Sequence, residues 1–301
     1  MKSEDFLRLY EQGYRDFKGL NLSGIDLSGQ ILVDVNLSNA NLTGANLSRA
    51  FLTKASFIGA TLDQADLKFA KLSASNFMAA SMVKANLQGA FGVSANFTRA
   101  SLSGAQLSYV NFRAAKLIDA NLSSANLTGA NLRNAELTRA NFAWANLTGV
   151  RMVGSAIALA RFPGATLDNA FLNGLNFSRM QLDGVSFKVA KLKGSIFKQA
   201  DLTAANFQGA SLQNSDFSGA QLVGAVLAQA NLHKAQFSGA NLNRIDPTEI
   251  DWADADLSNT CFYNESMQAA SQSASVRKAN RPTPISPREP APVSFRRPEY
   301  G

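Results

Sequence analysis

The side chains that could carry out catalysis or bind a metal are few and widely separated in this sequence. His233 is the only histidine and Cys261 the only cysteine, so neither a His–Cys metal cluster nor a histidine-based triad can be assembled from one of each. Asp63 and Asp66 are close together, but at outward positions we interpret them as a solvated pair rather than an acid–base couple. No glycine-rich phosphate loop precedes a helix. The sequence therefore predicts no enzymatic activity, no metal and no cofactor.

Overall charge and hydropathy limit the partners and the location that can be expected. The net charge of +7 and the pI near 9.6 mildly favour anionic partners, although many basic proteins bind none. No apolar run approaches the ~20 residues of a membrane-spanning helix, and the start, MKSEDFLRLYEQG, lacks the apolar stretch of a signal peptide. A single cysteine excludes an internal disulfide. We expect a cytoplasmic protein without a membrane span; its oligomeric state does not follow from the sequence.

A five-residue repeat organises nearly the whole chain. It is clearest at residues 120–128, where the order is A-N-L-S-S-A-N-L-T. A large apolar residue recurs every five positions from Phe17 to Phe262, and a small residue precedes it by two. This period matches neither the 3.6 of a helix nor the 2 of a flat strand. We interpret each unit as one short side of a coil, with the large residue inward and the small one beneath a corner, in one continuous array.

The repeated Ala-Asn/Asp-Leu-x-x pattern resembles that of the pentapeptide repeat proteins. The segment Asp5–Phe17 also resembles the N-terminal leader of many cyanobacterial members. The resemblance implies an all-β fold, a right-handed quadrilateral parallel β-helix with four units, hence twenty residues, in each coil. The sequence offers a check, because phenylalanines recur at this spacing in two runs and should form stacks of rings: Phe57, Phe77 and Phe97, and then Phe177, Phe197, Phe217 and Phe237.

The two ends of the array should be capped. Residues 3–12 predict a short amphipathic helix with Ser3 as its cap, so residues 1–16 would plug the first coil of a β-helix over 17–244. Residues 245–267 predict a C-terminal coil and cap, in which Trp252 and Phe262 point inward. Residues 268–301 are rich in Pro, Ser and Arg and lose the period, which predicts a disordered tail.

Three irregularities interrupt the repeat. Gly92 stands where a Leu should fill the core, which indicates either local repacking or a bulge. Met152 and Ile157 replace the usual Leu or Phe in a softer stretch near 151–160. Pro247 takes a core position and should weaken strand pairing, because proline cannot donate a backbone hydrogen bond.

With twenty residues in each coil, the outward positions of each side form columns along the rod. We call the sides by their inward residues: the first contains Phe17, the second Leu22, the third Leu27 and the fourth Leu32. The fourth side has aromatic and basic residues where the second and third are bland and polar. These residues are the candidate binding face: Phe51, Lys71, Phe91, Arg113, Arg133, Arg151, Phe171, Lys191 and Lys193.

Cations beside exposed rings suit an acidic protein partner, or phosphate contact with stacking of bases. The alternative is that the rings pack against their neighbours and the basic residues are spread by chance. A second candidate surface is a mildly apolar strip on the first side, formed by Ile58, Met78, Ile118 and Ile196. The tail offers a third, a basic motif at Phe295, Arg296 and Arg297, unless the tail is simply solvated.

The sequence therefore predicts a non-enzymatic scaffold, a rigid rod that presents the aromatic and basic face and the basic tail to another protein. The alternative is a rod that binds nucleic acid or another polyanion through the same face. The family resemblance adds a third function, since some pentapeptide repeat proteins mimic DNA and modulate gyrase. Such mimicry needs a strongly negative surface, whereas basic residues outnumber acidic ones between positions 17 and 264.

Overall fold

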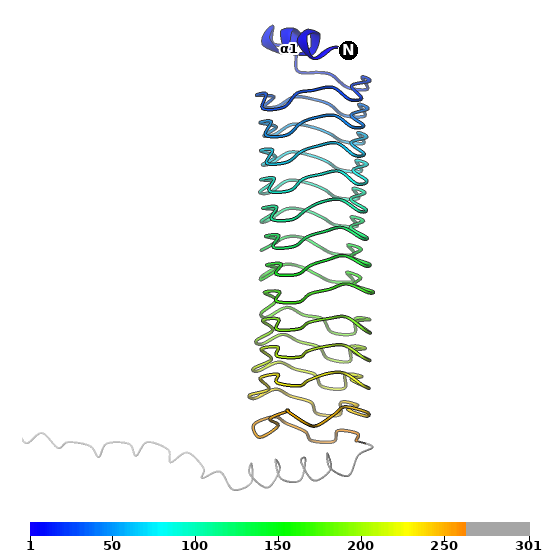
Figure 1. Ribbon diagram of the computed structural model, residues 1–301, viewed down its shortest axis with the longest axis vertical. Coiled ribbons are helices and arrows are strands. Elements are labelled where there is room, and N and C mark those ends of the chain that lie inside the picture. Colours follow the sequence, from blue (N-terminus) through cyan, green and yellow to red (C-terminus); the bar gives the residue numbers. More distant parts are fainter. Residues whose placement is uncertain (263–301) are drawn as a thin grey trace, which may run out of the picture.

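The computed structural model describes residues 1–262 and shows a straight rod of stacked four-sided coils (Figure 1). One helix, α1 (Ser3–Glu11), lies across the N-terminal end of the rod. Parallel bridges join residues twenty apart, as in Asn21 to Asn41 and Asn41 to Thr61. The twenty-residue coil that the resemblance implies is thereby confirmed. Each bridge is one residue long, and no longer strand occurs within the described range.

The unit Asn121–Ala125 shows what each of the five positions contributes. Asn121, at the first position, bridges to Asn141 in the next coil. Leu122, at the second, and Ala125, at the fifth, are both buried. Ser123 and Ser124 form the turn, and the fourth-position residue has the left-handed φ of 55°. The backbone N–H of Leu122 donates to the carbonyl of Asn141 at 2.8 Å, so the coils are held together by their backbones.

Phenylalanine rings stack along the interior as the spacing predicts. Centroids of Phe57 and Phe77 are 4.6 Å apart, and each ring from Phe177 to Phe237 in the second run lies 4.8–4.9 Å from the next. Phe187 and Phe207 belong to a separate stack beside this run. Both rings pack edge-on against Phe197, with centroid distances of 6.0 and 5.7 Å. Each buried large side chain contributes roughly 1.5–3 kcal/mol. The core is therefore a continuous column rather than a set of separate clusters.

Gly92 is accommodated by repacking. A Cβ placed on Gly92 would lie 2.9 Å from the ring of Phe112, so that ring already fills the space of the missing side chain. Phe91, next to it, keeps its bridges to Lys71 and Asn111, and Gly92 itself still donates to the carbonyl of Asn111. The bulge considered from the sequence does not form.

Helix α1 closes the first coil through one aromatic contact. Phe6 is fully buried, and its ring centroid is 4.1 Å from that of Phe17. The hydroxyl of Tyr10 donates to the carbonyl of Val33 at 2.9 Å and ties the helix to the rod. The prediction that Ser3 caps the helix is wrong: Ser3 is already helical, and Lys2 precedes it without a side-chain capping bond. The apolar contact, rather than a polar cap, fixes this end.

Pairing weakens at the C-terminal end as Pro247 predicts. Val226 and Asp246 are not bridged in the described part of the chain, whereas Asn206 and Val226 are. Trp252 is buried against the ring of Phe237, with centroids 5.5 Å apart. The indole therefore ends the phenylalanine column. Phe262, the other predicted inward anchor, is partly buried against the core. Residues 263–267 of the predicted cap, and the tail motif Phe295, Arg296 and Arg297, lie outside the described residues.

Candidate binding face on the fourth side

The structure brings six of the nine candidate residues into one column. Consecutive bridges connect the first positions of the fourth side from Ile31 to Asn231, and this ladder contains Phe51, Lys71, Phe91, Arg151, Phe171 and Lys191. Neighbouring members of such a ladder are about 4.8 Å apart. Arg113, Arg133 and Lys193 occupy third positions of the same side, and all three are exposed. The nine residues therefore lie in two adjoining columns of one side.

The rings in this column are neither buried nor fully exposed. Phe51, Phe91 and Phe171 expose 44, 41 and 38% of their surface. The ammonium of Lys71 lies 5.6 Å from the ring centroid of Phe91, and the guanidinium of Arg151 is at the same distance from Phe171. Such exposed cation–π pairs contribute about 0.5–1 kcal/mol. The alternative, that the rings pack against their neighbours, thus applies in part to Phe91 and Phe171, which each have a cation of the preceding coil at the ring. The exposed part of all three rings remains available to a partner.

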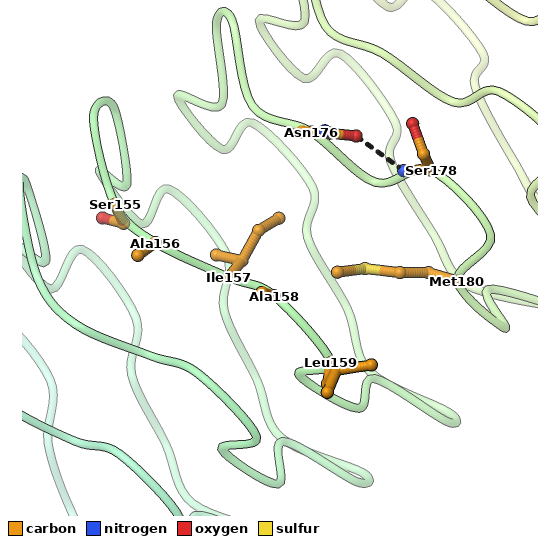
Figure 2. Close-up of a pocket in the computed structure, with 8 residues that line it drawn as sticks. All are labelled: Ser155, Ala156, Ile157, Ala158, Leu159, Asn176, Ser178 and Met180. Carbon is orange, nitrogen blue, oxygen red and sulfur yellow. Dashed lines mark hydrogen bonds between the residues drawn. The ribbon is translucent and has the colours of Figure 1, made fainter.

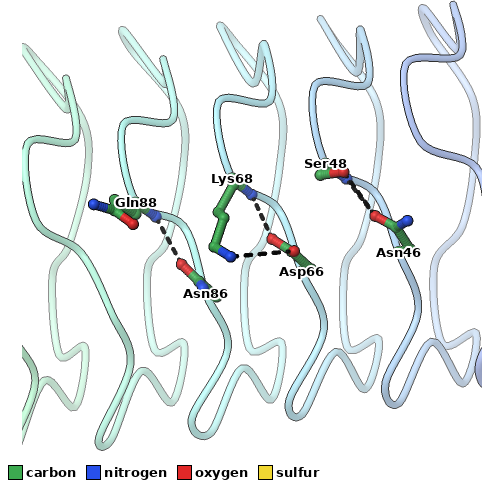
Figure 3. Close-up of polar contacts among 6 residues, drawn as sticks. All are labelled: Asn46, Ser48, Asp66, Lys68, Asn86 and Gln88. Carbon is green, nitrogen blue, oxygen red and sulfur yellow. Dashed lines mark hydrogen bonds and ion pairs between the residues drawn. The ribbon is translucent and has the colours of Figure 1, made fainter.

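Side-chain hydrogen bonds in the turns explain why Asn and Asp dominate the first position elsewhere. On the third side, the Oδ1 atoms of Asn46, Asp66 and Asn86 accept the backbone N–H groups two residues later, at 3.2, 2.9 and 3.2 Å (Figure 3). This side-chain turn satisfies a backbone donor that the ladder does not use. The recurring Asn is the sequence signal for it, although its role was not inferred from the sequence.

The aromatic and basic residues of the fourth side cannot make this bond. Phe, Lys and Arg have no acceptor atom in their side chains, so every such residue at a first position gives up an interaction of roughly 0.5–1.5 kcal/mol. Asn111 and Asn131, in the middle of the same column, keep the bond to the N–H of Arg113 and Arg133 at 3.3 Å. The fold therefore does not require aromatic or basic residues here.

Among the described residues, acidic groups lie only toward the two ends of this face. Asp251, at the first position of the last coil, is exposed, and Asp254 pairs with Nδ1 of His233 at 2.9 Å. Asp34 is the other acidic residue on this side, near the N-terminal end. Between Lys71 and Lys191 the face carries cations and neutral residues, so its middle is positively charged.

The apolar strip considered on the first side is weaker in the structure. Ile58, Met78 and Ile118 are third-position residues, whereas Ile196 belongs to the first-position column. Met78 is exposed, and the three isoleucines are half-buried. The four side chains therefore do not form one continuous column.

Exposed aromatic residues at fourth positions were missed from the sequence. The rings of Phe69, Tyr109 and Trp144 cover Gly89, Gly129 and Gly164 in the next coil, where an added Cβ would lie within 2.7 Å of the ring. An aromatic residue followed twenty positions later by glycine is the signal that identifies this arrangement. Trp144 exposes 73% of its surface despite the contact.

Carboxylates outside the face are held by local hydrogen bonds. The hydrogen bond from Arg139 lowers the pKa of Asp119, whose two oxygens accept from Nε and Nη2 at 2.6 and 2.7 Å. The backbone N–H of Ser28 likewise lowers the pKa of Asp26. No group of three His, Cys, Asp or Glu residues suited to a metal occurs within residues 1–262. No helix in that range is long and apolar enough to cross a membrane.

A four-sided rod with a continuous core and a long outer face defines a repeat solenoid, a class that presents extended surfaces for binding. Matches to the family model for pentapeptide repeats cover residues 21–154 and 160–244. The chain therefore belongs to the pentapeptide repeat family, which confirms the resemblance and supports the right-handed β-helix that it implies.

Solved structures of similar proteins include HetL, a pentapeptide repeat protein involved in heterocyst differentiation regulation in the cyanobacterium Nostoc sp. strain PCC 7120. It is 26% identical over 86% of this chain and 94% of its own, with a TM-score of 0.27. Full-length QnrB1, a plasmid-mediated fluoroquinolone resistance protein, is 16% identical over 88% of this chain and 100% of its own, with a TM-score of 0.38. Rfr23 from the cyanobacterium Cyanothece 51142 is 24% identical over 54% and 92%, with a TM-score of 0.17. The comparison with curated proteins found no match.

Proposed function

We propose that this protein is a non-enzymatic scaffold whose fourth side binds a protein partner. The observation that carries the proposal is the column of half-exposed rings with cations beside them, built on a rigid ladder. Aromatic and arginine side chains are enriched at the centres of protein interfaces. The partner surface should be flat and apolar and should carry acidic side chains.

Two features support a binding role for this column. Its aromatic and basic residues replace Asn or Asp at the cost of turn hydrogen bonds, so their presence is not explained by the fold. The backbone beneath them is fixed by bridges to both neighbouring coils, so little conformational entropy would be lost when a partner binds.

A charge reversal on the face tests this function. The variant K71E/R151E/K191E should fold normally, since all three side chains are exposed. The matched control K84E/R99E/K188E makes the same change in charge at exposed positions on the other three sides. In pull-downs from native lysate treated with nuclease, a partner that binds the face should be retained by the wild type and the control but lost by the face variant. Equal recovery of every protein by all three chains would contradict the assignment.

A polyanion is the second candidate ligand, because six cations occupy the two adjoining columns: Lys71, Arg113, Arg133, Arg151, Lys191 and Lys193. Binding of a 20-base-pair DNA duplex should then weaken steeply with salt, as expected when phosphate contacts release counterions. A DNA affinity that is undetectable at low salt, or unchanged in the face variant, would exclude this alternative. The positive charge of the face gives no support to mimicry of DNA.

A further inference from the structure

The ladder is interrupted inside the rod, where the coils at residues 155–164 and 175–184 separate on two consecutive sides. Ala156 and Asn176 are not bridged, and neither are Arg161 and Gln181, although each of these four residues is bridged to the coil on its other side. The third and fourth sides of the same turn remain bridged. The coils therefore form a wedge that is closed on two sides and open on the first and second.

Six backbone N–H groups that would pair across this opening in a regular coil have no hydrogen-bond partner among the residues that the structure describes. In a regular coil the equivalent group of Leu137 donates to the carbonyl of Ala156 at 2.8 Å. The six unpaired groups belong to Ile157, Leu159, Phe162, Gly164, Asn176 and Gln181. Two facing edges with free donors and acceptors are the pattern to which an added strand can bind.

Two large side chains at fifth positions explain the opening. Leu175 lies between Ser155 and Ser195 in its column, and Met180 occupies a column in which the adjacent residues are alanines. The side chain of Met180 extends from its coil toward Ile157 (Figure 2). Because interiors are closely packed, these larger side chains keep the two coils from reaching the usual spacing of about 4.8 Å.

The wedge contains two adjoining grooves, with volumes of about 370 and 450 Å³. Leu159, Ser178 and Met180 line both of them, so the grooves are continuous around the corner between the first and second sides. An extended segment of five residues is about 17 Å long. The opening runs along two sides of a coil, and five residues make each side. Each open edge is therefore comparable in length to such a segment.

The rim of the wedge determines which side chains would fit. Arg161 is exposed and has no carboxylate partner within residues 1–262, and Arg179 hydrogen-bonds to the amide of Gln199 rather than to an acid. Asp183 is the acidic residue at the grooves. Leu159 exposes 71% of its surface, which adds an apolar contact at the corner. The rim thus complements a segment that carries acidic and apolar side chains.

We propose that the wedge binds one extended segment of a partner protein by strand addition, with an acidic side chain of the segment directed to Arg161 and Arg179. The segment supplies carbonyl groups to the free N–H groups and its own N–H groups to the facing carbonyls. Proline is excluded from the paired positions because it has no N–H to donate. The chain's own residues 268–301 do not fit this description, because they are basic and contain six prolines.

The first test concerns the free edges themselves. Amide hydrogen exchange of the full chain should be fast at the six unpaired groups and slow at Leu137, which is paired. Replacing the two large side chains, L175A/M180A, should let the coils close and should slow exchange at the same six amides. Wild-type exchange as slow at these amides as at Leu137 would overturn the proposal.

The second test uses a phage-displayed library of random eight-residue peptides, selected on the wild-type chain and counter-selected on L175A/M180A. The enriched peptides should be poor in proline and should contain acidic and apolar residues. A synthetic copy should protect the six amides, bind about tenfold more weakly to R161E/R179E, and bind K84E/R99E unchanged. Failure to enrich such peptides, or equal binding to the closed variant, would overturn the proposal without affecting the assignment of the fourth side.

Discussion

Replacing Phe197 tests whether the ring column holds the rod together. Phe197 is fully buried, stacks on Phe177 at 4.9 Å and on Phe217 at 4.8 Å, and packs edge-on against Phe187 and Phe207. Truncation of a buried phenylalanine to alanine costs about 3–5 kcal/mol, which includes the cavity it leaves. F197A should lie at the upper end of this range, because aromatic pairs contribute about 0.5–1.5 kcal/mol each beyond burial.

The substitution F197L separates the two contributions. Leucine is the usual residue at the second position, so it keeps most of the buried volume and removes the ring contacts. Its cost should be about 1–3 kcal/mol, mainly from the lost ring pairs. F51A is the matched control, because it removes the same kind of side chain from an exposed first position instead of an inward second position. That substitution should change stability by about 0.5 kcal/mol or less.

Urea unfolding followed by circular dichroism gives the three values, and amide exchange shows how far the loss extends along the rod. Because each coil contacts only its neighbours, exchange should accelerate most in the coils next to Phe197. If F197A and F51A were equally destabilised, the reasoning that assigns stability to the inward column would be wrong.

Two further substitutions test contacts on the surface. G164A should destabilise the rod, because its Cβ would lie 2.3 Å from the ring of Trp144. Thermal unfolding should show that this loss of stability is partly removed when G164A is made in the W144A background. The control G24A should show no such coupling to W144A, because nothing lies within 4 Å of a Cβ at that position. D119N should remove stability near neutral pH, because the hydrogen bond and charge of Arg139 lower the pKa of Asp119 in the folded state. The difference in unfolding free energy between D119N and the wild type should shrink as the pH falls below 3.8, the ordinary pKa of the carboxyl, and should vanish once the pH is below the lowered pKa. A difference that grew in acid would contradict the pairing.

The five-residue period was enough to place the inward residues, and the columns of the fourth side followed once the family resemblance implied a coil of twenty residues. This reasoning succeeds because one residue in five points inward and every coil has the same length, so residues twenty apart are neighbours. Phe177 and Phe197 could therefore be paired before any coordinates were known, and so could Lys71 and Phe91. Which atoms meet within a column did not follow, since the period fixes backbone position and leaves side-chain direction open.

The features that the sequence did not predict depend on contacts between columns. Met152 and Ile157 indicated a softer stretch, and the wedge opens beside Ile157, but the side chains that open it, Leu175 and Met180, belong to the next coil. A large residue at the fifth position acts on the spacing to the preceding coil, so its effect is seen only when residues twenty apart are compared. The cap at Ser3 was wrong for a related reason, because the buried ring of Phe6 sets the position of α1.

The two proposed surfaces follow from one property of the repeat. Inward second and fifth positions determine whether coils stack, and outward first and third positions are free to vary once stacking is secured. On the fourth side the ladder persists from Ile31 to Asn231 even where Gly92 interrupts the inward column, and the outward residues depart from Asn, so the surface changes without opening the coils. At the wedge the fifth positions depart, so the ladder itself opens. A departure at an outward position thus creates a side-chain surface, and the large fifth-position residues at the wedge expose backbone, which is why the two sites should bind partners in different ways.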